Sequence, residues 1–156
     1  MILNTHQRFL PCSPNQAAYL IDNLAGPHEA LWPVGRWPRI RLHAGLSPGS
    51  QGGHGPIRYF VEDYQPGRSV KFRFTAPRGF YGYHALSLKE HSQGCLLEHD
   101  LQMTTSLWGW LLWHFIYGPL HDALLEDALD QAAGHFGQPA RNRHSPWVRL
   151  LRALLR

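Results

Sequence analysis

The chain has 156 residues, of which 44% are hydrophobic and 17% charged, so its length and composition fit one globular domain with a single core. Its formal net charge of +4 lies in the C-terminal end, because residues 1–140 hold ten basic and eleven acidic side chains, whereas residues 141–156 hold five arginines and no acid. A nearly neutral body without a stripe of basic and aromatic residues argues against a nucleic-acid-binding protein, and we expect no nucleic-acid partner.

A strand followed by a helix is predicted at the N-terminal end. Residues 2–10 read as the strand, and the segment from Ser13 to Gln16 supplies a helix N-cap, a proline at the first helical position and a glutamine three residues after the cap. The predicted helix carries Ala17, Leu20, Ile21 and Leu24 on one face and ends at Gly26-Pro27. A second short helical turn is expected over residues 28–32.

Five strands are predicted between residues 39 and 105, where the hydrophobic pattern changes to a period of two. They span about residues 39–46, 55–64, 69–76, 82–90 and 95–105. The links at 47–53, 65–69, 76–82 and 91–94 contain the glycines and prolines that turns require. Because links this short join antiparallel neighbours, we expect a meandering antiparallel sheet.

One long helix is predicted after Thr105. Apolar residues recur there at spacings of three and four: Leu120, Leu124, Leu125, Ala128, Leu129, Ala132 and Phe136. Pro119 removes a backbone donor, so a kink or break is expected near Gly118.

The last segment, residues 145–156, is predicted to form a basic amphipathic helix. Its apolar stripe consists of Trp147, Leu150, Leu151, Leu154 and Leu155, and its arginines lie mostly away from that stripe. Such a helix can pack on its own domain, lie on an anionic membrane or bind in the groove of a partner, and the pattern fits each of these equally.

Three segments carry a resemblance to a known superfamily: residues 36–42 (RWPRIRL), 53–74 and 118–130 (GPLHDALLEDALD). With the order of the elements, they resemble bacterial members of the START-like helix-grip superfamily (SRPBCC; polyketide cyclase/dehydrase and lipid transport). The resemblance implies an α+β fold, with a curved antiparallel sheet wrapped around a long C-terminal helix and short helices after the first strand. It implies a START-like ligand-binding domain at residues 1–137, followed by a linker and the basic helix at 138–156. It transfers no catalytic motif, because this superfamily supports many activities.

In such a fold, the concave face of the sheet meets the long helix across a partly filled space, which is the expected site for a small molecule. Alternation along the strands gives the candidates Phe72, Phe74, His84, Leu86, Leu97, His99, Leu101 and Met103. The helix adds Trp110, Trp113, His114, Tyr117 and His121. Each aromatic taken singly also fits a packed core, but their density between Trp108 and Tyr117 exceeds what one helical face needs. They could be pocket lining, a gate or an interface patch.

Eleven histidines are unusual for this length, and histidine both binds metals and transfers protons near neutral pH. The chain has no HExxH or HxH motif, and Glu98 falls on the opposite face of its strand from His99, so no metal site and no cofactor are predicted. His84, His99, His114 and His121 are candidates for ligand anchors or for a general acid and base, although each alone also fits a hydrogen-bonded structural residue.

The first functional hypothesis is binding or transport of a small hydrophobic molecule, of lipid, polyketide or aromatic type, between the sheet and the C-terminal helix. The alternative is a cavity enzyme of the polyketide cyclase/dehydratase type that uses histidine acid–base catalysis. An interaction module is a third class. The sequence specifies neither the ligand nor the oligomeric state.

The cellular location is predicted from three features. Cys12 and Cys95 form no disulfide framework, and the first residues lack the basic flank and the long apolar run of a signal peptide. The longest apolar run, residues 107–117, is shorter than the roughly 20 residues of a membrane span. We expect a cytoplasmic protein, with weak peripheral contact of residues 145–156 at the inner membrane as a further hypothesis.

Overall fold

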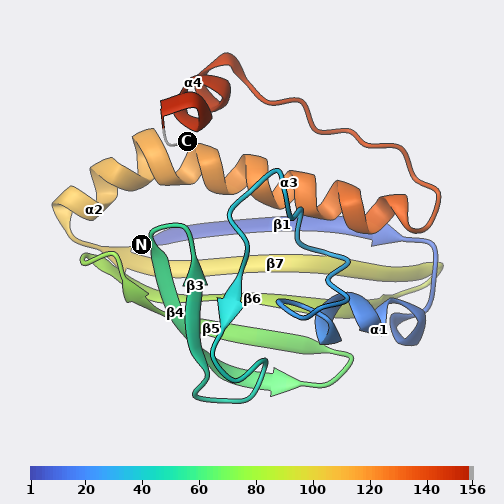
Figure 1. Ribbon diagram of the computed structural model, residues 1–156. Coiled ribbons are helices and arrows are strands. Elements are labelled where there is room, and N and C mark those ends of the chain that lie inside the picture. The colour runs from blue at the N-terminus through green and yellow to red at the C-terminus, as the bar shows by residue number, and fades with distance from the viewer. Residues whose placement is uncertain (155–156) are drawn as a thin grey trace.

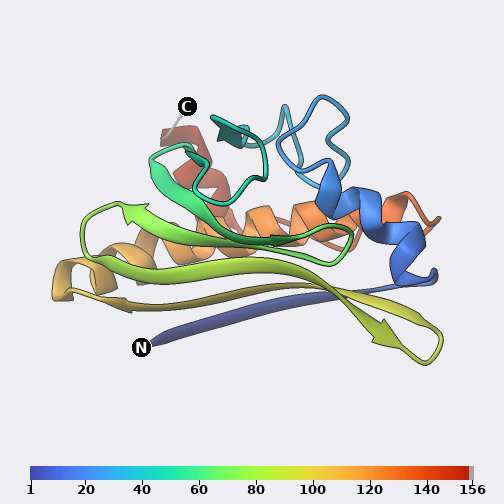
Figure 2. The same ribbon diagram turned by 90° about the horizontal axis from the view of Figure 1, so that it is seen from below.

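A seven-stranded antiparallel sheet forms one layer of the computed structural model, which describes residues 1–154 (Figure 1). Its strands are β1 (Ile2–Leu10), β2 (Arg41–Leu42), β3 (Gln51–His54), β4 (Ile57–Gln65), β5 (Ser69–Ala76), β6 (Phe80–His91) and β7 (Gly94–Thr105). The strand order is β1-β7-β6-β5-β4-β3-β2, so the chain meanders from β2 to β7 and β1 lies beside β7. The sheet curves beneath the long C-terminal helix, as Figure 2 shows from below. The predicted meander is confirmed.

The prediction is wrong at the β2–β3 edge, where a strand was expected at 39–46 and a turn at 47–53. Only two residues pair in β2, and β3 occupies part of the predicted turn. A β-carbon at Gly52 would lie 1.9 Å from the carbonyl oxygen of Arg41, and one at Gly53 would lie 2.0 Å from that of Ile57. The two glycines therefore let β2, β3 and β4 approach closely, although glycine more often marks a turn.

The first helix, α1 (Pro14–Asp22), begins as predicted with a reciprocal capping box between Ser13 and Gln16. The second helical turn expected at 28–32 is absent from the described residues, and turns and bends take its place. The Glu29 carboxylate accepts hydrogen bonds from the backbone N–H groups of Ala25, Leu31 and Trp32. These bonds satisfy the backbone without a helix.

The long C-terminal helix continues past Pro119 without a break, and a π-helical segment directly precedes Gly118, where a kink or break was expected. It consists of α2 (Leu107–Leu112), a π-helical segment η1 (Trp113–Tyr117) and α3 (Gly118–Gly134). The π-helical turn is closed by a hydrogen bond from the Gly118 N–H to the carbonyl oxygen of Trp113, five residues earlier. Because Pro119 has no N–H, the carbonyl of Phe115 lacks its α-helical donor, and it accepts a hydrogen bond from Trp147 Nε1 at 2.9 Å.

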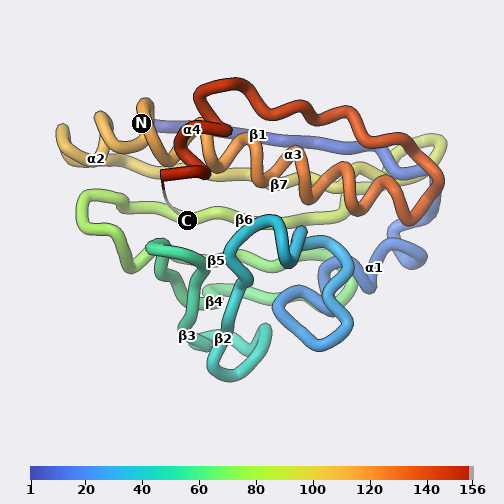
Figure 3. Tube along the Cα trace, turned by 45° about the horizontal axis from the view of Figure 1, so that its top comes forward, coloured from blue at the N-terminus to red at the C-terminus, as the bar shows by residue number. Residues whose placement is uncertain are grey.

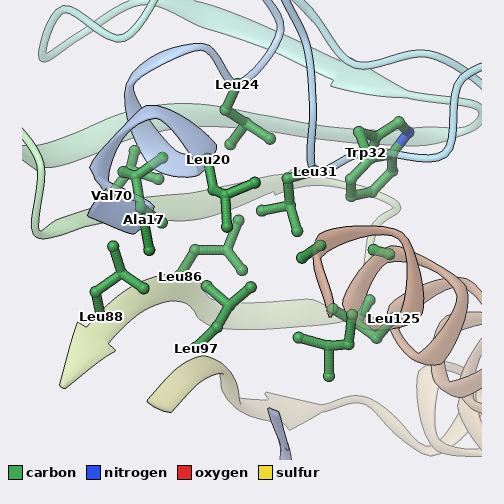
Figure 4. Close-up of a cluster of buried hydrophobic side chains, with 14 of the residues drawn as sticks. Ala17, Leu20, Leu24, Leu31, Trp32, Val70, Leu86, Leu88, Leu97 and Leu125 are labelled. Atoms are coloured by element: carbon green, nitrogen blue, oxygen red, sulfur yellow. The ribbon is translucent and has the colours of Figure 1, made fainter. Parts of the chain in front are cut away.

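The main hydrophobic core joins α1, the concave face of the sheet and α3. Figure 4 shows Leu20 of α1, and Leu24 just after that helix, on the same side as Val70, Leu86 and Leu97 of the strands. A second cluster contains Phe80, Leu101, Met103 and Trp113, and Phe74 packs against both clusters.

The C-terminal segment returns along α3 and ends in α4 (Pro146–Leu154), which packs against α3 (Figure 3). The predicted apolar stripe is only partly correct, because Val148 and Leu151 are buried whereas Trp147, Leu150 and Leu154 are exposed. Leu155, the last member of that stripe, and Arg156 lie outside the described residues. The division at residue 137 and the membrane contact of residues 145–156 stay predictions. Across residues 1–154, no helix is long and apolar enough to cross a membrane.

Candidate functional site

A cavity of about 740 Å³ lies between the concave face of the sheet and the helical segment η1–α3. Apolar side chains dominate its walls, and the helix contributes a stripe at three- and four-residue spacing: Trp113, Ile116, Tyr117, Leu120, His121, Leu124 and Leu125. A chamber of this size with few polar groups is typical of a site for a small organic molecule.

Most of the predicted site residues meet in this cavity. Those that line it are Phe72, Phe74, His84, Leu86, His99, Leu101, Trp113, Tyr117 and His121. Strand alternation and helical spacing therefore find the correct faces of β5, β6, β7 and the long helix. Whether these residues bind a ligand stays a prediction.

Four predicted site residues lie outside the cavity lining: Leu97, Met103, Trp110 and His114. Leu97 shares its strand face with His99 but is fully buried in the main core. Met103 is buried in the second cluster, packed with Phe80 and Trp113. Trp110 is 45% exposed, and its ring contacts that of His114 at a centroid distance of 4.2 Å on the solvent side of the helix.

The aromatic-rich segment from Trp108 to Tyr117 divides between two environments. Trp113 and Tyr117 line the cavity, whereas Trp108 and Phe115 are exposed at 68% and 59%. Pocket lining thus accounts for part of this concentration of aromatics.

Sequence reasoning missed the part of the cavity wall that comes before β5 in the chain, and the part in α4. The residues are Trp32, Arg36, Trp37, Pro38 and Ile40 in the loop before β2, His54 in β3, Ile57 in β4 and Arg152 in α4. Two tryptophans in one proline-rich segment were a usable signal for the loop. Arg152 offered none, because its position depends on the return of the chain along α3.

A buried histidine pair supplies the main polar feature of the cavity wall. His84 Nδ1 and His99 Nε2 are 3.2 Å apart, and the His84 ring stacks against Phe72 and Phe74. Burial lowers the pKa of both histidines well below the ordinary value, so both are neutral near pH 7. His84 Nε2 and His99 Nδ1 have no hydrogen-bond partner among the described residues.

The state of this pair follows from imidazole chemistry. A neutral imidazole has one N–H donor and one acceptor nitrogen, and the contact between the rings uses one of each. Whichever histidine donates, one donor and one acceptor are left over. The pair can therefore hold a hydroxyl or carbonyl oxygen, or accept a proton at one nitrogen while giving one up at the other.

A second polar group lies at the seam between β1 and α3. The ring nitrogens of His6 lie 2.7 Å from a carboxylate oxygen of Glu126 and 3.1 Å from one of Asp122, and Asn4 donates to Asp122 at 2.9 Å. Burial alone would lower the pKa of His6, but the two carboxylates outweigh it and raise that pKa. The arrangement is an imidazole–carboxylate network that ties β1 to α3.

This seam also brings together potential metal ligands that sequence reasoning missed. His6, His121 and Asp122 each offer one possible ligand atom, and these three atoms lie within 4.8 Å of one another. The residues come from separate elements, so no spacing motif marks them.

Comparison with known proteins identifies the fold. No family model matches the chain, and no curated protein sequence matches it. Among solved structures, XoxI from Bacillus cereus is 18% identical with a TM-score of 0.57, covering 88% of this chain and 97% of its own. CalU16 from Micromonospora echinospora is 16% identical with a TM-score of 0.57, and the match covers 98% of this chain and 81% of CalU16. The chain has the helix-grip fold.

The α+β helix-grip architecture predicted from the sequence is thereby confirmed. DynU16, from the dynemicin biosynthetic locus, is also similar, at 15% identity and a TM-score of 0.56 over 90% of this chain. This helix-grip chain spans about half of DynU16, 49% of its length. Identities this low support a likeness of fold, and function has to be argued from the cavity itself.

Proposed function

We propose that this protein binds or carries a small, largely apolar molecule that bears a hydroxyl or carbonyl group. The observation that carries the proposal is the neutral His84–His99 pair in the wall of an apolar cavity of about 740 Å³. Buried polar atoms without partners are costly, and a ligand oxygen that reached one of these nitrogens would lower that cost.

The chemical class of the ligand follows from the lining. Aromatic rings of Phe72, Phe74, Trp113 and Tyr117 favour a flat or branched apolar body of lipid, polyketide or aromatic type. DynU16, a neighbour in structure, comes from a biosynthetic locus, which supports a biosynthetic intermediate or product as the ligand.

A second candidate function is a cavity enzyme of the cyclase or dehydratase type. The same pair favours it, because two titratable groups that are in contact in the wall of one cavity can transfer protons in both directions. The low pKa of each histidine leaves no protonated imidazole to act as a general acid near neutral pH. Binding is therefore the better supported function.

Native mass spectrometry of freshly purified protein, followed by titration with the neutral dye Nile red, tests the proposal. We expect Phe74→Ala to weaken dye uptake more than it weakens folding, because Phe74 is partly buried and lines the cavity. The matched change Leu129→Ala, in the packed core of α3, should cost about 2–5 kcal/mol of unfolding free energy. If Phe74→Ala is equally destabilising and its folded fraction binds normally, the proposal is wrong.

A further inference from the structure

Two arginines stand at the side of the cavity that α4 and the loop near residue 36 cover. Arg152 of α4 and Arg36 both belong to the lining. The guanidinium of Arg152 lies 4.4 Å from the centre of the Trp37 ring, a cation–π contact. Its Nη2 donates to the carbonyl oxygen of Arg36 at 2.6 Å, and its Nη1 is 2.8 Å from His144 Nδ1. The charged group is therefore fixed in position by neutral partners.

The charge of Arg152 is not balanced by a carboxylate within ion-pair distance among residues 1–154. The nearest acid in this network is Asp127, whose oxygens accept hydrogen bonds from Trp37, Asn142 and His144. Arg36 Nη1 is 3.8 Å from Asp127 Oδ2, at the limit of an ion pair. Arg36 thus pairs weakly with a carboxylate that is already hydrogen-bonded, and Arg152 reaches that carboxylate only through His144.

The fixed arginine also has spare donors. A guanidinium carries five N–H groups in a planar fork, and the protein contacts of Arg152 use two of them. Such a fork matches the two oxygens of a carboxylate, and the contact is strongest where water is partly excluded.

We propose that Arg152, with Arg36 beside it, binds a carboxylate group of the ligand. The inference rests on the proposed function and narrows it: the ligand is an amphipathic acid, with its apolar body in the cavity, an oxygen at the His84–His99 pair and its carboxylate under α4. The two polar positions then set the direction in which the ligand enters.

Competition against bound Nile red tests this, with dodecanoic acid and dodecan-1-ol as competitors that differ only in the headgroup. The wild-type protein should bind the acid about tenfold more tightly than the alcohol. Arg152→Gln should abolish that preference and leave the affinity for the alcohol within about twofold. Arg152→Lys, which keeps the charge without the fork, should give an intermediate preference.

The matched control is Arg149→Gln, on the same helix, exposed and outside the cavity lining, which should keep the wild-type preference. Thermal melts of each variant show that α4 stays folded. Equal affinities of the wild-type protein for acid and alcohol, or a preference that survives Arg152→Gln, would overturn the carboxylate site while leaving the apolar cavity intact. Failure of the wild-type protein to take up Nile red would overturn the proposed function as well.

Discussion

Asp130→Asn should lower the free energy of unfolding by about 3 kcal/mol near neutral pH, measured by urea denaturation. One oxygen of Asp130 accepts a hydrogen bond from buried Arg8, and the other accepts from the backbone N–H groups of Arg141 and Asn142 at 2.7 and 2.6 Å. Asparagine removes one of the two carboxylate charges that balance Arg8, leaving only that of Glu126, and presents an amide N–H₂ group where acceptors are required. The substitution therefore loosens β1 and the C-terminal segment from α3 together.

The pH dependence has a defined sign. Burial alone would raise the pKa of Asp130, but hydrogen bonds from Asn142, Arg8 and Arg141 outweigh it and hold that pKa below 3.8. Since the native pKa is below the unfolded one, this stabilisation is present above roughly pH 4 and is lost as the pH falls through the native pKa. The difference in free energy of unfolding between the wild type and Asp130→Asn should therefore become smaller in acid. Asp63→Asn, an exposed control, should change stability by less than about 0.5 kcal/mol.

A constant gap between wild type and Asp130→Asn from neutral pH into acid would contradict the electrostatic origin of the effect.

The largest expected effect on binding comes from Leu101→Trp, which should weaken Nile red uptake about tenfold and lower the free energy of unfolding less than Met103→Trp does. Leu101 lines the cavity and pairs across the sheet with His84, so an indole there occupies the ligand space. Met103→Trp is the matched control, two residues along the same strand face. Met103 is packed against Phe80 and Trp113 with no cavity beside it, so overpacking should cost about 1–3 kcal/mol.

Thermal melts and dye titrations of the two variants separate these outcomes. The cavity is misplaced if both tryptophans destabilise alike and the Leu101→Trp protein still takes up the dye as the wild type does.

Strand and helix periodicity predicted most of the fold, because one face of each element is buried. Strands β4 to β7 and the start of α1 follow directly from alternation and capping. The β2–β3 edge could not be predicted, since Gly52 and Gly53 serve close strand contact there and read as a turn. The helical turn predicted around Glu29 is absent for a similar reason, because the Glu29 side chain accepts the backbone N–H groups that a helix would pair with carbonyl oxygens.

For the candidate site, alternation gives the face of a strand but not where along the strand a cavity begins. Leu97, His99, Leu101 and Met103 share one face, yet only His99 and Leu101 line the cavity. The space beside Leu97 is filled by the main core and that beside Met103 by the second cluster, which are tertiary contacts. Arg152 and Trp37 are far apart in sequence, so their stacking leaves no local pattern.

The π-helical turn holds about one residue more than an α-helical turn, because its hydrogen bond runs from Gly118 back to Trp113. Deleting one residue within η1 can therefore restore a regular α-helical turn and leave α2 and α3 in place. A longer deletion would carry Trp108 toward the place of Gly109, where a β-carbon alone would approach the carbonyl oxygen of Gly79 within 2.7 Å and a tryptophan has no room. A relative one residue shorter in this stretch should therefore keep the same packing, whereas larger deletions should be excluded.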